Sequence, residues 1–322
     1  MIDHLEKALE DLSLPESPAR LFDPIRHTLQ AGGKRLRPKL TMLGCELAGG
    51  DPIKAIPAGV AVELIHNFTL IHDDIMDDAA TRRGRPTVYK KWGANDAILS
   101  GDYLFALAIE QLGRYKNDHE LEKERFGMLY DTLLSGVRTV CEGQSRDMDF
   151  ETRSEVSLQE YLQMIGQKTA ALLKTSIELG ALVAKANPHI VSLAGEIGYD
   201  AGIAFQIQDD LLDATGNAET FGKVIGGDIR EQKKTCLYVL AMEQLNNDEK
   251  KTLSKIYASK EPTDKQVDEV IAIFHKTGSI TEAQKLMDKY YQRALSGLGE
   301  FHENEPAEKI KLLLEQLRNR EK

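Results

Sequence analysis

The sequence predicts an all-α fold, and three observations lead to this prediction. Hydrophobic residues make up 42% of the 322 residues but aromatic residues only 6%, and the apolar content is mostly Leu, Ile and Ala, which suit helices better than a sandwich of strands. Apolar residues recur at helical spacing along almost the whole chain. The sequence contains no convincing series of alternating strands and no hairpin signal such as Asn-Gly between β-branched runs.

The predicted helices follow one another from the first residues to the last. Apolar residues that share a helical face are Leu5, Leu9 and Leu12 near the start, Tyr161, Ile165, Leu172 and Leu179 in the middle, and Ile310, Leu313, Leu314 and Leu317 at the end. Gly and Pro separate the helices at Pro15 and Pro18, Gly32-Gly33, Gly49 to Pro52, Gly84 to Pro86, Asn187-Pro188, Gly226-Gly227 and Glu261-Pro262. Between these breakers lie ten or more candidate helices, several longer than 20 residues. Because no low-complexity linker divides them, we expect a single all-α domain over residues 1–322.

Composition excludes several classes of function. The 51 acidic residues outnumber the 41 Lys and Arg, so the net charge of −10 argues against general nucleic-acid binding, which needs a cationic surface. No window approaches the roughly 20 apolar residues of a membrane span, and the acidic start MIDHLEKALEDL differs from a signal peptide. Cys45, Cys141 and Cys236 are too few and too far apart for a disulfide framework or a zinc site. We therefore expect a cytoplasmic protein.

The first basic segment precedes the first long helix. Residues 31–38 read AGGKRLRP, in which two glycines permit a tight turn and Lys34, Arg35 and Arg37 project before Pro38. A flexible turn that opens a helix and carries several cations can bind phosphate. A solvated basic turn is the alternative.

Two later segments each combine an apolar helix with the pattern Asp-Asp-x-x-Asp. Residues 61–78 read AVELIHNFTLIHDDIMDD and residues 202–213 read GIAFQIQDDLLD. The aspartates are Asp73, Asp74 and Asp77 in the first motif and Asp209, Asp210 and Asp213 in the second.

The spacing of these aspartates predicts a metal site. Residues four apart stack on one helix face, so Asp73 lies over Asp77 and Asp209 over Asp213. Like charges at this spacing destabilise a helix by about 0.2–0.5 kcal/mol per pair, and a divalent cation offsets that cost. Magnesium prefers a few carboxylates together with phosphate oxygens and water. One such motif could be a solvated acidic helix end, but two copies on apolar helices favour the metal site.

Further cations could neutralise a phosphate-bearing ligand. Arg82, Arg83 and Arg85 follow the first motif within a turn or two, and Lys168-Thr169 lie in GQKTAALLKTS. The loop 215–235, TGNAETFGKVIGGDIREQKKT, follows the second motif with four glycines and Lys223, Lys233 and Lys234, the composition of a mobile lid. His66 lies two turns before Asp73. Three of these have a structural alternative: Lys168 as a surface lysine, the loop 215–235 as a polar connector, and His66 as a buried histidine.

Taken together, these segments resemble the trans-isoprenyl diphosphate synthases, the polyprenyl synthetase family. The resemblance covers nearly the whole chain, in the family's order and spacing: GGKRLRP, LIHDDIMDDAATRRGRPT, GQKT, FQIQDDLLD and GKVIGGDIREQKKT. It implies an all-α bundle of the isoprenoid synthase type around a deep central cavity, and a homodimer. It also implies a trans-prenyltransferase that condenses isopentenyl diphosphate head-to-tail with an allylic diphosphate (dimethylallyl, geranyl or farnesyl) and releases pyrophosphate.

The resemblance assigns roles to the residues that match the family's motifs. Six aspartates would hold three Mg²⁺ ions on the allylic diphosphate: Asp73, Asp74, Asp77, Asp209, Asp210 and Asp213. The residues that would contact this diphosphate are Arg82, Lys168, Lys223 and Lys233. The residues that match the isopentenyl diphosphate site are Lys34, Arg37, His66 and Arg83. Thr169 and Gln206 match polar groups beside the developing allylic cation.

The helix before the first motif bears on product length, because bulk one or two turns earlier acts as a floor in the family. Phe68 lies five residues before Asp73, Thr69 is small, and Ile65 comes one turn earlier. With no insertion inside the first motif, this resembles the short-chain type that makes geranylgeranyl diphosphate. A farnesyl or longer-chain polyprenyl diphosphate synthase is the alternative, and plain core packing is the alternative role for Phe68.

Two other functions remain to be weighed. A class I terpene cyclase also has an aspartate-rich helix, but its second motif usually carries Asn, Ser and Glu, and it needs no segment such as GGKRLRP. A non-catalytic subunit of a prenyl synthase generally loses acidic motifs, whereas both are intact here. We therefore expect an active prenyltransferase.

Overall fold

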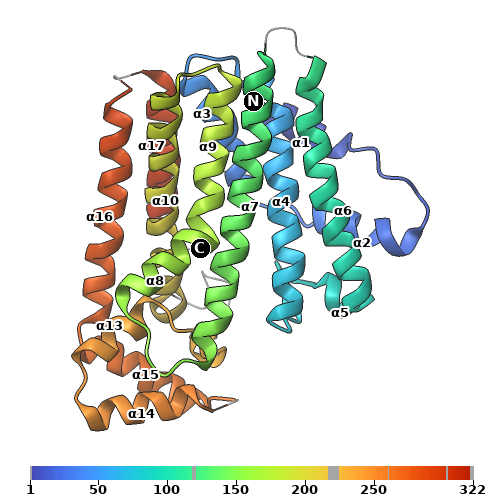
Figure 1. The fold of residues 1–322 in the computed structure, drawn as a ribbon. Helices are drawn as coiled ribbons and strands as arrows, with labels where there is room; N and C mark the ends of the chain where they lie inside the picture. The colour runs from blue at the N-terminus through green and yellow to red at the C-terminus, as the bar shows by residue number, and fades with distance from the viewer. Residues whose placement is uncertain (1, 118–120, 217–224, 260, 302–303, 320–322) are drawn as a thin grey trace. The chain divides into compact units, whose positions relative to one another are not determined.

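The computed structural model describes residues 2–117, 121–216, 225–259, 261–301 and 304–319 (Figure 1). Almost every element in these ranges is a helix, which confirms the predicted all-α fold. The longest helices are α4 (Ile56–Met76), α7 (Lys123–Thr152), α10 (Pro188–Thr215) and α16 (Ser279–Gly299), in keeping with the expectation of several helices longer than 20 residues. The predicted Gly and Pro breakers all lie between helices or at a helix start.

The chain forms two compact units. The first unit comprises Met1–Val137 and Thr175–Gly195, and the second comprises Arg138–Lys174 and Glu196–Lys322. Helices α7, α9 (Ala171–Val183) and α10 each contribute residues to both units.

The first unit is built on α4 and α6 (Ala94–Gly113), which lie side by side (Figure 1). Its other elements are α1 (Ile2–Glu10), α2 (Ala19–Leu29), α3 (Leu36–Leu47), the 3₁₀ helices η1 (Pro52–Ala55) and η2 (Arg114–Asn117), and α5 (Val88–Trp92). Helix α3 packs directly on α9. The approach is so close that a Cβ on Gly180 would come within 2.0 Å of the Thr41 carbonyl oxygen. Only glycine allows the two backbones to approach this closely.

Helix α4 forms the core of the first unit. In contrast to the sequence expectation that no window approaches a membrane span, the stretch Pro52–Met76 is long and apolar enough for one. However, 61% of its apolar window is buried inside the structure. Val60, Val62, Leu64 and Ile65 are all almost fully buried. The stretch is therefore a core helix, and no other helix in the described ranges passes the same test.

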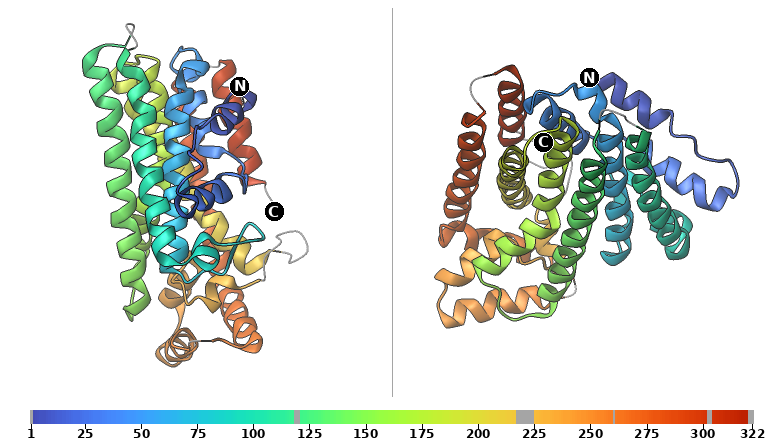
Figure 2. Two further views of the ribbon diagram at one scale, coloured as in Figure 1. Left: turned by 90° about the vertical axis from the view of Figure 1, so that its right-hand side faces the viewer. Right: turned by 45° about the horizontal axis from the view of Figure 1, so that its top comes forward.

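The second unit contains the remaining helices. These are α8 (Leu158–Ile165), the π-helix η3 (Gly166–Ala170), α12 (Gly227–Arg230), α13 (Cys236–Gln244), α14 (Asn247–Tyr257), α15 (Asp264–Lys276) and α17 (Glu305–Arg318), with α16. Helices α14 and α15 lie across one end of α16 (Figure 2). Tyr161, Tyr238 and Phe274 are the largest fully buried side chains of its core.

Local sequence explains where several of these helices begin. Ser157, Asn246 and Thr263 precede α8, α14 and α15, and each side chain accepts a hydrogen bond from the first-turn backbone. The residue three positions later, Glu or Gln, bonds back to the cap in each case. These capping boxes satisfy N–H groups that the helix itself leaves without partners.

One short hairpin departs from the helical prediction. Strands β1 (Thr81–Arg82) and β2 (Arg85–Pro86) pair in antiparallel fashion around Arg83 and Gly84. Both turn residues have positive φ, at 54° and 71°, as a two-residue turn of type I′ requires. Two residues per strand are too few to leave an alternating pattern in the sequence, so periodicity could not predict this hairpin.

Candidate active site

The first aspartate motif occupies the C-terminal end of α4, in the first unit. Asp74 is only 4% exposed, and Arg82 Nε donates a 2.7 Å hydrogen bond to its Oδ1. Arg82 Nη2 also lies 3.7 Å from Asp73 Oδ2. Burial raises the pKa of Asp74 more than the Arg82 contact lowers it. Asp73 and Asp77 are partly exposed at the helix end, where an ion could reach their carboxylates.

The hairpin after α4 brings arginines back to this end of the helix. Arg83 donates a hydrogen bond to the carbonyl oxygen of Gly32, in the turn before α3. A Cβ on Gly33 would come within 2.9 Å of the Arg83 guanidinium, so glycine makes this contact possible. A shallow hollow, open to solvent, is lined by Arg82, Arg83 and Arg85 together with α2 and α4 residues. The three arginines at its edge could contact an anionic group.

His66 and Arg37 meet beside this region. Arg37 Nη1 lies 3.2 Å from His66 Nε2. Because a guanidinium can only donate, the His66 Nε2 must accept, and the ring proton belongs on Nδ1. Burial, reinforced by the positive charges of Arg37 and Arg83, holds the pKa of His66 well below its usual range. His66 is therefore a neutral ring that can donate from Nδ1.

The second aspartate motif lies on α10 in the second unit. Asp210 is 4% exposed, and its Oδ2 accepts hydrogen bonds from the Tyr161 hydroxyl at 2.6 Å and from the Cys236 backbone N–H at 2.8 Å. Gln206 Nε2 donates to Asp210 Oδ1 at 3.0 Å. Burial raises the pKa of Asp210 to about 6, although these hydrogen bonds favour the charged form. Asp209, its neighbour, is less buried.

Asp228 adds a carboxylate next to the last aspartate of this motif. Its backbone N–H donates to Asp213 Oδ2 at 3.0 Å, and the Gly226 N–H donates to the Asp213 carbonyl at 2.8 Å. Burial and the charges of Asp213 and Asp210 raise the pKa of Asp228 well above its ordinary value. The sequence analysis did not select Asp228, although it directly follows the Gly226-Gly227 pair.

Lys168 and Thr169 lie on the π-helix η3. Lys168 Nζ is 2.5 Å from Asp147 Oδ2, and Thr169 Oγ1 donates to Gln206 Oε1 at 2.8 Å. The structure thus brings Thr169 and Gln206 together, and it adds Asp147, which sequence reasoning missed. The sequence signal available for Asp147 was a run of acidic residues near the end of α7, but nothing in that run indicated a contact with Lys168. Short π-segments inside helices are frequent at functional sites.

Glycines on the flanking helices make room for the π-helix. A Cβ on Gly143 of α7 would come within 2.2 Å of the Lys168 backbone nitrogen, and a Cβ on Gly202 of α10 within 2.5 Å of Ala170 Cα. Both helices therefore contact η3 at the backbone. This close packing fixes the backbone that carries Lys168 and Thr169.

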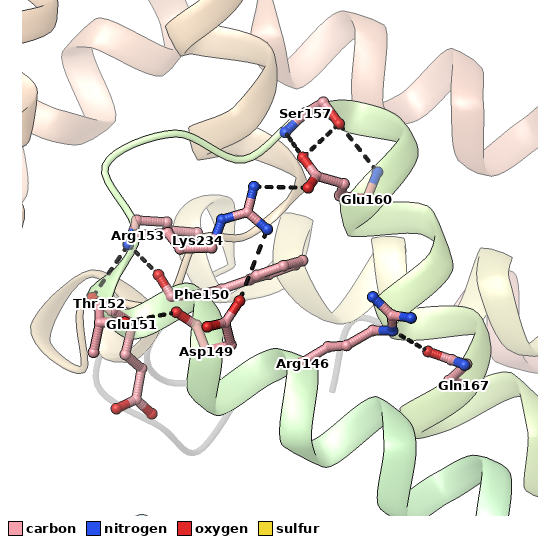
Figure 3. Close-up of polar contacts among 10 residues, drawn as sticks. All are labelled: Arg146, Asp149, Phe150, Glu151, Thr152, Arg153, Ser157, Glu160, Gln167 and Lys234. Carbon is pink, nitrogen blue, oxygen red and sulfur yellow. Dashed lines mark hydrogen bonds and ion pairs between the residues drawn. The ribbon is translucent and has the colours of Figure 1, made fainter.

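Figure 3 shows how polar contacts tie the neighbouring segments of the second unit together. Lys234 Nζ bonds to the carbonyl oxygens of Phe150 and Glu151 in the last turn of α7, where the helix dipole favours a cation. Arg146 Nε donates to Gln167 Oε1 at 2.8 Å, next to Lys168. Lys233 Nζ is 2.6 Å from Glu231 Oε2. Lys223, which the resemblance also placed at the diphosphate, lies outside the described residues.

The three residues considered for product length lie along α4. Ile65 is fully buried, and the Thr69 hydroxyl donates to the His66 carbonyl at 2.8 Å. The Phe68 ring lies 4.8 Å from the His72 ring and 5.7 Å from the Phe105 ring of α6, centroid to centroid. Phe68 is thus partly buried within an aromatic cluster between α4 and α6.

The predicted site residues fall into two groups. Lys34, Arg37, His66, Arg82, Arg83 and the first aspartate motif belong to the first unit; Lys168, Thr169, Gln206, Lys233 and the second motif belong to the second. Lys34 is exposed on its turn. Within the described residues, no group of three or more Asp, Glu, His or Cys side chains forms a ready metal cluster.

Comparisons with known proteins agree with the motifs. A model of the polyprenyl synthetase family matches residues 18–274. The geranylgeranyl diphosphate synthase of Saccharolobus solfataricus is 42% identical over 88% of this chain and 85% of its own. The short chain isoprenyl diphosphate synthase of Methanothermobacter thermautotrophicus is 36% identical over 99% and 95%.

A solved structure extends this agreement to the fold. The crystal structure of geranylgeranyl pyrophosphate synthetase from Pyrococcus horikoshii aligns with a TM-score of 0.92 and 35% identity, covering 99% of this chain and 96% of that one. The family match covers more than half of the chain, and both relatives exceed 30% identity over most of it. The chain therefore belongs to the polyprenyl synthetase family and is a trans-prenyltransferase.

Proposed function

We propose that this chain condenses isopentenyl diphosphate with an allylic diphosphate, releases pyrophosphate and makes geranylgeranyl diphosphate. The observation that carries the proposal is that both aspartate motifs are intact and supported by hydrogen bonds. The names of the relatives at 42% and 36% identity support the product class.

The donor chemistry of the two aspartate motifs supports a magnesium site. Carboxylate oxygens are hard donors of the kind Mg²⁺ prefers, and Asp73, Asp77 and Asp209 each keep part of their side chain exposed. The three remaining aspartates, Asp74, Asp210 and Asp213, are buried and bonded to protein groups. We therefore propose that they orient the motifs in addition to supplying negative charge. We propose three Mg²⁺ ions per site, as the family resemblance implies. When bound, they supply positive charge that stabilises the departing pyrophosphate.

The chain's own cations share this task. Arg82, Lys168 and Lys233 would bind the allylic diphosphate and spread the negative charge that develops as its C–O bond breaks. Asp147 holds Lys168 in place through the 2.5 Å contact. The oxygens of Thr169 and Gln206 would face the developing allylic cation. The proton lost after the new C–C bond forms would pass to the released pyrophosphate.

The second substrate would bind at the other basic group. Lys34, Arg37 and Arg83 offer positive charge to isopentenyl diphosphate. His66, neutral because its pKa is lowered by burial and by the arginines, would donate from Nδ1 to a phosphate oxygen. Water must be kept from the allylic cation until the double bond of isopentenyl diphosphate reacts with it.

We further propose that residues 1–322 act as one domain, in the cytoplasm, as a homodimer. Exposed apolar side chains on α6 support the dimer, since Ile98 is 42% and Leu99 57% exposed and unpaired apolar surface is typical of interfaces. Light scattering coupled to gel filtration measures the oligomeric state.

The central experiment is incubation of the protein with Mg²⁺, isopentenyl diphosphate and, in turn, dimethylallyl, geranyl and farnesyl diphosphate. The expected result is geranylgeranyl diphosphate as the main product from at least one starter, identified by chromatography and mass spectrometry. EDTA should stop the reaction. A protein that forms no new C–C bond with any starter would contradict the proposal, and a shorter or longer main product would correct the product assignment.

A further inference from the structure

Arg35 is oriented differently from the other cations of its turn. It lies between Lys34 and Arg37 at the start of α3, yet its side chain is only 7% exposed. Its backbone is left-handed, with φ of 47° and ψ of 40°. This conformation is unfavourable for a residue with a Cβ, and it persists only where the surroundings hold it.

The guanidinium of Arg35 connects the turn to three other elements of the first unit. Nη1 donates to Glu63 Oε1 of α4 at 2.7 Å, Nε donates to Glu6 Oε1 of α1 at 3.1 Å, and Nη2 donates to the Leu29 carbonyl at the end of α2 at 3.3 Å. Glu63 is 2% exposed. The Arg35–Glu63 ion pair is therefore the buried member of this network.

Because the Arg35–Glu63 ion pair is buried, a contribution to folding stability alone does not explain why it is present. Removing two charges from water costs free energy that their attraction often fails to recover, and apolar residues of similar volume commonly serve stability as well. A planar guanidinium with several donors does, however, fix the direction of a backbone more strictly than an apolar side chain does. The pair therefore suits a role in positioning.

The neighbours of the pair show what would be positioned. Two residues after Arg35, Arg37 contacts His66 at 3.2 Å, and His66 lies three residues after Glu63 on the same face of α4. The contacts Arg35–Glu63 and Arg37–His66 thus join the same two segments side by side. The Arg35–Glu63 contact is buried, whereas the Arg37–His66 contact belongs to the basic group that would bind a diphosphate.

We propose that the Arg35–Glu63 ion pair is a positioning device for the isopentenyl diphosphate site, holding the Lys34–Arg37 turn on α4 so that its cations and His66 converge. This inference rests on the proposed function. It predicts that loosening the pair weakens isopentenyl diphosphate binding more than allylic binding. Lys168 and Lys233 belong to the second unit, and Arg82 is held by Asp74 rather than by the pair.

The test measures KM for each substrate and kcat, together with thermal unfolding, in four variants. Glu63→Gln keeps the shape but removes the charge, and Arg35→Lys keeps the charge but removes the planar fork. Arg35→Met/Glu63→Met removes both charges together, so that no buried charge is left alone. The matched control is Asp96→Asn, the buried acid of the Arg20–Asp96 ion pair in the same unit.

The expected result is a rise of about tenfold or more in KM for isopentenyl diphosphate in all three pair variants. In those variants kcat and KM for the allylic substrate should change by less than about threefold, and Asp96→Asn should lower the unfolding temperature without either KM change. The double Met variant is decisive because it leaves no buried charge alone: with folding checked by thermal unfolding, a KM that stays high supports positioning, and a wild-type KM overturns it. Should Glu63→Gln fail to fold, Arg35→Lys and the double variant still separate these outcomes.

Failure of this inference can be told apart from failure of the proposed function. If the wild-type protein shows no condensation, the proposed function fails. If the wild type is active and the pair variants keep a normal KM for isopentenyl diphosphate, only the positioning role is wrong.

Discussion

At the residue scale, neighbouring side chains of one motif differ in what surrounds them. Asp210 accepts three hydrogen bonds from Tyr161, Cys236 and Gln206, whereas Asp209 beside it is less buried. The same contrast separates Asp74 from Asp73 at the end of α4. Each motif thus contains at least one aspartate that is held by the protein and an adjacent one that is more exposed.

The buried tyrosine gives a first prediction. Tyr161→Phe removes the donor to Asp210 Oδ2 and should lower the free energy of unfolding by about 1.5–3 kcal/mol, the range for a hydrogen bond to a charged group. Urea unfolding followed by circular dichroism measures this. Tyr130→Phe, at a partly exposed tyrosine of the first unit, is the control and should change stability by less than about 0.5 kcal/mol. Equal effects in both variants would show that the Asp210 contact is unimportant.

The cysteines give a second prediction. Burial raises the pKa of Cys45 to about 12 and that of Cys236 well above its ordinary value, whereas Cys141 is exposed. Because the thiolate is the reactive form, a maleimide at neutral pH should label Cys141 alone in the folded protein and all three cysteines in urea. Mass spectrometry of the labelled peptides checks this, and fast labelling of Cys45 in the folded protein would contradict its burial.

The raised thiol pKa also fixes a pH dependence. Between the ordinary value of 9.0 and the folded value of about 12, the folded state keeps the Cys45 proton and the unfolded state releases it. Stability from this group is therefore present below pH 9 and is lost as the pH rises toward 12. Cys45→Ala should flatten this alkaline loss in a series of urea titrations.

Phe68 tests the interpretation of product length. If Phe68 limits the growing chain, Phe68→Ala should give longer products, whatever packing against His72 and Phe105 it also loses. If it only packs against His72 and Phe105, the variant should lose about 3–5 kcal/mol or somewhat less, since Phe68 is only partly buried, with an unchanged product. Product sizing and unfolding measured on the same sample separate the two, and Phe105→Ala controls for loss of the aromatic cluster.

At the element scale, the π-helix η3 depends on glycines of its neighbours. Gly143→Ala would put a Cβ within 2.2 Å of the Lys168 backbone, so η3 must shift. We expect a loss of about 1–3 kcal/mol in stability and a reduction of tenfold or more in kcat/KM from misplacing Lys168 and Thr169. Gly127→Ala on the same helix meets nothing within 4 Å and should be neutral or stabilising. Full activity in Gly143→Ala would show that the close approach is dispensable.

The sequence predicted those elements whose position depends on local residue patterns. Apolar spacing predicted the helices, and Gly and Pro predicted where they end. It could not predict partners that come from distant segments: Tyr161 reaches Asp210 across 49 positions and Lys168 reaches Asp147 across 21. Arg35 shows the same limit, because charge and spacing made it look like a ligand-facing cation, whereas its left-handed backbone turns it toward Glu63.

At the scale of the whole molecule, the proposed reaction requires both aspartate motifs. Asp73→Asn or Asp209→Asn should reduce kcat/KM by at least about 10²-fold, because each removes charge that would stabilise the leaving group. If both motifs serve the same diphosphate, the double variant should lose little more than either single variant. Steady-state assays with Mg²⁺ measure this, with circular dichroism to confirm helical content. If the double variant instead loses kcat/KM by the product of the two single losses, the two motifs have independent roles.

The Cys236 amide that bonds to Asp210 belongs to the main chain, at the first residue of α13. Almost any side chain introduced at that position leaves the donor in place, so a random mutagenesis screen would pass over this contact. Proline is the exception, since it lacks the N–H yet is well tolerated at the opening of a helix. Cys236→Pro would thus delete this anchoring N–H, which no other natural substitution does, while also replacing a fully buried side chain.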